Sequence, residues 1–162
     1  MIPTIIQATV FIVYVYFIYS QFGILPSISD SWYKLKPLKL GFLFTLFCWG
    51  VGIPMLFHTS DISPFFFFSG SGLCFVGVAT AFKLKIGIER YVHGAGAIIC
   101  VISGLIALWT DYKLWFPSLL FIIGTIIILL IKTKNKIWWF EIAAFLSILS
   151  GLIYHYFSYL AI

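Results

Sequence analysis

Six long runs of apolar residues, separated by short polar segments, dominate this sequence. The runs cover residues 4–22, 40–57, 64–82, 91–109, 114–131 and 137–160. A helix needs about 20 apolar residues to cross the hydrocarbon core of a bilayer, and each run is near this length. The runs lack the alternating polarity of strands in a membrane barrel. The sequence therefore predicts an all-α polytopic membrane protein, a six-transmembrane-helix bundle that forms one domain over residues 1–162.

Composition excludes most other classes. Of the 162 residues, 62% are hydrophobic and 9% are charged, against roughly 25% charged residues in soluble domains. A soluble domain of this size cannot bury so much apolar surface, so we exclude a cytosolic globular domain and a disordered chain. The net charge of +5 comes from basic residues near helix ends, where they indicate topology, and we expect no nucleic-acid partner.

Basic residues alternate between the loops and predict an orientation. Nine of the ten basic residues lie in the first, third and fifth loops: Lys34, Lys36, Lys39, Lys83, Lys85, Arg90, Lys132, Lys134 and Lys136. Lys113 alone lies in the other two loops. The positive-inside rule then places both termini outside. Abundant Lys, Ile and Phe with a single Arg are typical of an AT-rich bacterial genome, so we expect the bacterial inner (plasma) membrane.

Small residues recur at helical spacing. Gly96, Cys100 and Gly104 lie four residues apart and share one helix face, which favours close helix packing in lipid. Packing within the chain is the main interpretation, and a seam between copies in a homo-oligomer is the alternative. Cys48, Cys74 and Cys100 lie far apart inside apolar runs, so we expect small hydrophobic residues rather than metal ligands.

Polar residues near the predicted cytoplasmic ends of the helices form a candidate binding cluster. His93 and Glu141 each lie about one helical turn inside the membrane, on helices that run in the same direction. Glu89 lies four residues before His93 on the same face, and Asp30 lies in a loop that can fold back onto this end. This cluster could bind an ion, a proton or a lipid headgroup; alternatively, it consists of helix-end groups that satisfy one another.

A second polar set lies at the predicted outer ends of the helices. His58, Asp61 and His155 could together leave an open position on a zinc ion. Neither an HExxH nor an HxxxH spacing is present, so we predict no metal and no cofactor. A nucleophile elbow and a phosphate-binding loop are also missing from the sequence, which leaves no predicted catalytic residue.

Three short motifs carry a family resemblance. The segment Pro26-Ser27-Ile28-Ser29-Asp30 resembles the P-x-I-S-D motif of the damage-regulated autophagy modulator (DRAM) family, whose relatives include the FRAG/Sfk proteins. His93 opens a segment similar to that family's H-x-x-G-A motif, and Glu141 resembles its carboxylate near the start of the last span. The resemblance implies a six-helix fold, a lipid-linked or regulatory role, and no established catalytic mechanism. That family is usually drawn with its N-terminus in the cytoplasm. The distribution of lysines in this chain predicts the opposite orientation.

Together these observations predict a non-enzymatic integral membrane protein whose cytoplasmic-side cluster binds a lipid headgroup or ion, or docks a partner. One alternative is a small membrane-embedded enzyme, metal-dependent or not, that modifies lipids. Another is an accessory subunit of a larger membrane complex. The expected partners are membrane lipids, with other membrane subunits or a second copy as further options.

Cysteine labelling tests the predicted orientation. In a variant whose three native cysteines are replaced by alanine, Lys85→Cys should resist an impermeant thiol reagent added to spheroplasts, because its loop is predicted to be cytoplasmic. Thr59→Cys, in the second loop, should react under the same conditions. Labelling of Lys85→Cys without permeabilisation would show that the orientation is inverted.

Overall fold

The computed structural model describes residues 2–58, 64–79 and 86–160, and all its regular elements are helices. These are α1 (Ile2–Phe22), α2 (Ser31–Leu35), the 3-10 helix η1 (Lys36–Leu38), α3 (Phe42–His58), α4 (Pro64–Ala79), α5 (Ile86–Thr110), α6 (Phe116–Leu130) and α7 (Lys136–Leu160). The predicted all-α fold is confirmed for the described residues.

Within the described ranges, three helices are long and apolar enough to cross a membrane, judged by length and composition. Their apolar parts are Pro3–Phe22 in α1, Tyr91–Thr110 in α5 and Lys136–Ser158 in α7. Shorter apolar helices occupy Phe42–Phe57, Pro64–Val78 and Phe116–Leu130. Each of the six predicted runs therefore contains one apolar helix, and three of these helices reach the length of a membrane span.

Two polar segments that the sequence analysis treated as loops are partly helical. Residues 31–38 form α2 and η1, which Leu35 anchors with a fully buried side chain. Pro37 fits the first turn of η1, where its missing N–H costs nothing. Lys39 then ends the turn in the left-handed region with φ 59°. The helix α5 begins at Ile86, five residues before the predicted start at Tyr91.

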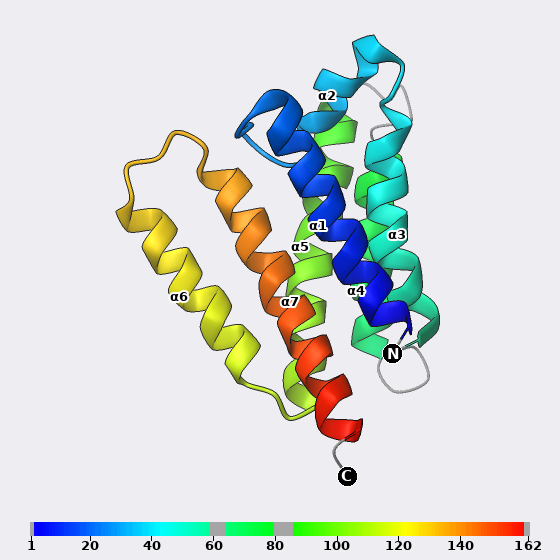
Figure 1. The fold of residues 1–162 in the computed structure, drawn as a ribbon, viewed down its shortest axis with the longest axis vertical. Helices are drawn as coiled ribbons and strands as arrows, with labels where there is room; N and C mark the ends of the chain where they lie inside the picture. The colour runs from blue at the N-terminus through cyan, green and yellow to red at the C-terminus, as the bar shows by residue number, and fades with distance from the viewer. Residues whose placement is uncertain (1, 59–63, 80–85, 161–162) are drawn as a thin grey trace.

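The long helices run side by side along the longest axis of the molecule (Figure 1). The helix α4 packs between α3 and α5, whereas α1 packs on α3 and α7. The helix α6 lies at one side of the bundle, next to α7 (Figure 1). One end of the bundle carries α2, η1 and the start of α7, and we call it the α2 end. The opposite end contains the start of α1 and the end of α7 (Figure 1).

Aromatic stacking joins α1, α3 and α7 in the core. The rings of Tyr14 and Phe47 stack with centroids 4.3 Å apart and planes 8° apart. Phe11 stacks on Phe145, with centroids 4.9 Å apart. Such pairs contribute about 0.5–1.5 kcal/mol each beyond the burial of their surface, so they help to fix α1 against its two neighbours.

Glycines bring the backbones of α4 and α5 into contact. A Cβ atom at Gly72 would lie 2.6 Å from the carbonyl oxygen of Gly96 and 2.8 Å from the backbone nitrogen of Cys100. Ser69 strengthens this contact, because its hydroxyl donates a 2.7 Å hydrogen bond to the carbonyl oxygen of Cys100. The stripe of small residues thus serves packing within the chain. Of the three cysteines, all expected to be buried small hydrophobic residues, Cys48 and Cys100 are buried and Cys74 is partly exposed.

Two glycine-to-alanine changes test this packing. Gly72→Ala should lower the free energy of unfolding by about 1–3 kcal/mol, because the added methyl group meets backbone atoms that cannot move aside. Gly94→Ala, on α5, is the matched control, since no described atom outside its chain neighbours and its own helix backbone lies within 4 Å of the added Cβ. The control should be neutral or raise stability by about 0.5–1 kcal/mol. Thermal unfolding in detergent measures both, and equal effects would contradict the assigned α4–α5 contact.

Candidate functional site

The connection between α1 and α2 folds back onto the start of α7. Its first residue, Gly23, has φ 70° and turns the chain away from α1. The backbone N–H of Trp138 donates a 3.1 Å hydrogen bond to the carbonyl oxygen of Pro26. The side-chain amide of Asn135 donates a 3.0 Å hydrogen bond to the carbonyl oxygen of Ile24. The loop thus contributes two backbone carbonyl groups to its attachment to α7.

Glu141 completes this attachment from one turn further along α7. Its carboxylate accepts a hydrogen bond from the backbone N–H of Ile28. Asp30 lies in the same loop, where Ser27 donates a 2.9 Å hydrogen bond to its carboxylate and accepts a 3.1 Å bond from its backbone N–H. The structure therefore brings the Asp30 loop and Glu141 together, and each of the two carboxylates has its own donor.

A second contact at this junction was missed by the sequence analysis. The hydroxyl groups of Tyr14 and Ser31 share a buried hydrogen bond of 2.6 Å, which joins α1 to the first residue of α2. Ser31 is completely buried. Ser31 directly follows the Ser-Asp pair of the motif, which was the available sign that it has a structural role. Nothing in the apolar run around Tyr14 indicated that this tyrosine is its hydrogen-bond partner.

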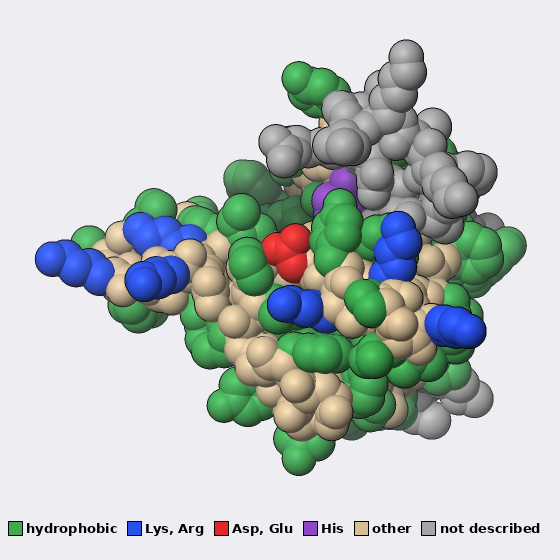
Figure 2. Space-filling model, turned by 90° about the horizontal axis from the view of Figure 1, so that it is seen from above, with side chains coloured by type: hydrophobic (Ala, Val, Ile, Leu, Met, Phe, Trp, Pro, Cys, Tyr) green, Lys and Arg blue, Asp and Glu red, His purple; other side chains and the backbone are tan. Residues whose placement is uncertain are grey.

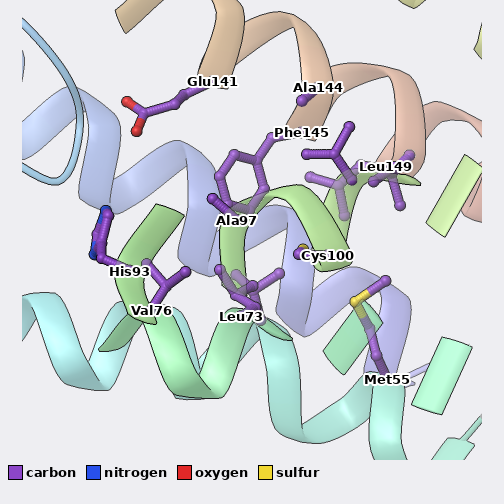
Figure 3. A pocket seen from close by; sticks show the side chains of 13 residues that line it. Met55, Leu73, Val76, His93, Ala97, Cys100, Glu141, Ala144, Phe145 and Leu149 are labelled. Atoms are coloured by element: carbon purple, nitrogen blue, oxygen red, sulfur yellow. The ribbon is translucent and has the colours of Figure 1, made fainter. Parts of the chain in front are cut away.

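An internal cavity of about 70 Å³ lies between α3, α4, α5 and α7 (Figure 3). Thirteen residues line it: Val51, Met55, Leu73, Val76, His93, Ala97, Cys100, Val101, Glu141, Ala144, Phe145, Ile148 and Leu149. Glu141 and His93 lie at one end of the cavity, on the walls formed by α7 and α5 (Figure 3). The imidazole of His93 also stacks on Phe44, with ring centroids 6.4 Å apart.

The lining combines two polar groups at one end with apolar side chains along the rest. A carboxylate and a neutral imidazole can both accept hydrogen bonds, and an imidazole N–H can also donate to a phosphate. Among the side chains that the structure describes, no lysine or arginine lines the cavity. An engineered apolar cavity of about 150 Å³ holds benzene, so a cavity of half that size accepts only a small apolar group or the end of a chain. The arrangement suits a ligand with a polar head and a slender apolar part.

The predicted inner cluster is brought together in part. Glu141 and His93 line one cavity, and Asp30 belongs to the loop that bonds to Glu141. The sequence predicts an imidazole beside Glu141, whereas the structure supplies the Ile28 N–H as a partner. Glu89 belongs to α5, but its side chain lies outside the described residues. Its place beside His93 stays a prediction.

The predicted outer set lies mostly outside the described part of the chain. Asp61 and the side chain of His58 are not described. The imidazole of His155 stacks on the ring of Tyr112, with centroids 3.7 Å apart and planes 2° apart. Burial and, to a smaller extent, the negative charge of Asp111 raise the pKa of Tyr112, which keeps its hydroxyl protonated. Among the described residues, no group of three or more His, Cys, Asp or Glu could hold a metal ion.

Comparison with protein-family models, with curated proteins and with solved structures found no match to this chain. The resemblance to the DRAM family stays a prediction that rests on the three short motifs.

Replacement of Glu141 tests its attachment to the loop. Glu141→Ala leaves the buried N–H of Ile28 without its acceptor, which should lower the free energy of unfolding by about 1–3 kcal/mol. Glu141→Gln should cost less, because the amide oxygen can still accept this bond. Thermal unfolding compares the two variants with Asp30→Asn, whose carboxylate bonds to Ser27 instead. Equal losses for alanine and glutamine would show that the Ile28 bond does not stabilise the fold.

Proposed function

We propose that this chain is a six-span integral protein of the bacterial inner membrane and that it binds a lipid headgroup without enzymatic activity. The headgroup lies at the polar end of the cavity, between Glu141 and His93. The observation that carries the proposal is the cavity itself, which is apolar along its length and polar at its α2 end.

Six spans are supported by the way the shorter helices accompany the long ones. The helix α6 has 15 residues, or about 23 Å at 1.5 Å per residue. This is less than the hydrocarbon thickness of about 30 Å, a mismatch that a bilayer accommodates by local thinning. The described parts of α3 and α4 have 17 and 16 residues. They run beside α5 and α7 along the same axis (Figure 1).

Charge at the α2 end supports the proposed orientation. Lysine side chains are spread over this end, on both sides of an acidic side chain (Figure 2). Lys34, Lys36, Lys39, Lys132 and Lys134 are exposed there. The positive-inside rule places such an end in the cytoplasm. The start of α1 and the end of α7 lie at the opposite end, which agrees with an even number of spans and both termini outside.

The polar end of the cavity fits an ethanolamine headgroup. A primary ammonium group can donate to the free lone pairs of the Glu141 carboxylate, and a phosphate can accept from the imidazole of His93. The residues that carry the family resemblance support the same location. Ile28 lies in the first motif, His93 begins the second, and Glu141 is the third.

Lipid retention measured by native mass spectrometry tests the proposal. The protein is reconstituted in nanodiscs that contain equal amounts of phosphatidylethanolamine and phosphatidylcholine, whose quaternary ammonium cannot donate hydrogen bonds. After transfer to detergent, the native chain should retain phosphatidylethanolamine preferentially. Glu141→Gln should reduce this retention about tenfold, because a charge-assisted hydrogen bond is replaced by a weaker neutral one.

Two further variants separate a binding site from general effects. Asp111→Asn is the matched control, since it removes a carboxylate charge from the turn after α5, at the other end of the bundle. It should leave retention unchanged. Ala97→Phe should fill the cavity and reduce retention while Glu141 remains in place. Equal retention by the native chain, Glu141→Gln and Ala97→Phe would overturn the proposed function.

A further inference from the structure

A groove on the outside of the bundle lies where α2 and η1 meet the start of α3. Its volume is about 490 Å³. Its lining residues are Trp32, Lys36, Lys39, Gly41, Phe42, Thr45, Leu46 and Trp49. None of these residues lines the internal cavity, so the groove is a separate site. Both of its charged residues are lysines.

Both basic residues of the groove lie on η1 or directly after it. Lys36 begins η1, and Lys39 ends it in the left-handed region. The ammonium group of Lys36 lies 4.7 Å from the ring centroid of Trp32, which holds this side chain over the groove. Lys39 is exposed. The two lysines therefore place positive charge at the α2 end of the groove.

The rest of the groove is an apolar track along α3. Phe42, Leu46 and Trp49 follow one another at spacings of four and three residues and so share one helix face. The track extends about 10 Å along the helix, at 1.5 Å per residue. Gly41 lies between η1 and α3, where the chain passes close to Trp32. A Cβ atom at Gly41 would lie 3.2 Å from the indole nitrogen of Trp32. The indole thus packs directly over the chain where α3 begins.

We infer that this groove binds a phospholipid with an anionic headgroup. The phosphate lies between Lys36 and Lys39, and one acyl chain follows the track of Phe42, Leu46 and Trp49. Charge complementarity selects this occupant, because both charged groups of the lining are cationic and lie at one end. A second groove, of about 370 Å³, runs between α1 and α3 and shares Leu46, so it adjoins the first and accepts the other acyl chain.

Competition between two lipids tests this inference. The native protein is placed in nanodiscs with equal amounts of phosphatidylglycerol and phosphatidylcholine, and retained lipid is measured by native mass spectrometry. Phosphatidylglycerol should be retained preferentially. Replacing Lys36 and Lys39 together by glutamine should weaken its retention about fivefold for each lysine. Leu46→Gln should also weaken it, because the acyl chain then meets a polar side chain.

The control is a second pair of lysines at the same end of the bundle. Replacing Lys132 and Lys134 together by glutamine removes the same charge from the loop before α7, away from the groove. This variant should retain phosphatidylglycerol as the native chain does. Equal losses in the two double variants would show a general effect of surface charge and overturn the inference. Equal retention of both lipids by the native chain would show unselective contact with the bilayer and overturn it as well.

This experiment is independent of the proposed function. The internal cavity is tested with phosphatidylethanolamine and Glu141→Gln, whereas the groove is tested with phosphatidylglycerol and the Lys36/Lys39 pair. A thermal unfolding measurement in each lipid shows whether the variants fold. Phosphatidylglycerol should raise the melting temperature of the native chain and leave that of the Lys36/Lys39 double variant unchanged. The same rise in both proteins would contradict the groove as the binding site.

Discussion

The hydrogen bond from the backbone N–H of Ile28 to Glu141 is the contact on which the α2 end of the bundle depends. A carboxylate in an apolar helix costs several kcal/mol unless a donor reaches it. The chain supplies that donor from a position 113 residues away, so the first connection must close onto the last long helix. Once it does, Trp138 also donates to Pro26. The loop, which follows α1 directly, is then bonded to α7. These bonds add to the direct packing of α1 on α7.

Packing in lipid explains why a cavity forms beside this junction. Lipid tails offer no hydrophobic drive for association, so helices approach closely only where side chains are small. Gly72 and Gly96 bring α4 and α5 into backbone contact. Between α5 and α7 the small side chains of Ala97 and Ala144 instead face a common space and leave it unfilled. The same kind of residue therefore produces a tight seam on one side of α5 and a cavity on the other.

Much of the fold could be predicted because apolar runs of this length have few stable alternatives. The positions of six apolar helices, the burial of Cys48 and Cys100, and the shared location of His93 and Glu141 all follow from run length and depth. Contacts that depend on backbone atoms could not be predicted. Gln7 is buried inside the first run and donates a 2.9 Å hydrogen bond to the carbonyl oxygen of Val51, and the Ile28–Glu141 bond also pairs a side chain with a main-chain group. Sequence patterns identify side chains, but every residue except proline has the same main-chain N–H and C=O groups. The main-chain partner of a polar side chain therefore cannot be predicted from the sequence.

The two proposed lipid sites differ in the groups that they present. Glu141 offers carboxyl oxygens inside the bundle, where low polarity strengthens a hydrogen bond from an ammonium group. Lys36 and Lys39 offer positive groups at the surface, where ions of the solution weaken their attraction for phosphate. A phosphatidylglycerol headgroup has no ammonium group that could donate to Glu141, so it would be left unpaired in the cavity. The two proposed sites therefore favour different lipids, although both lie at the α2 end of the bundle.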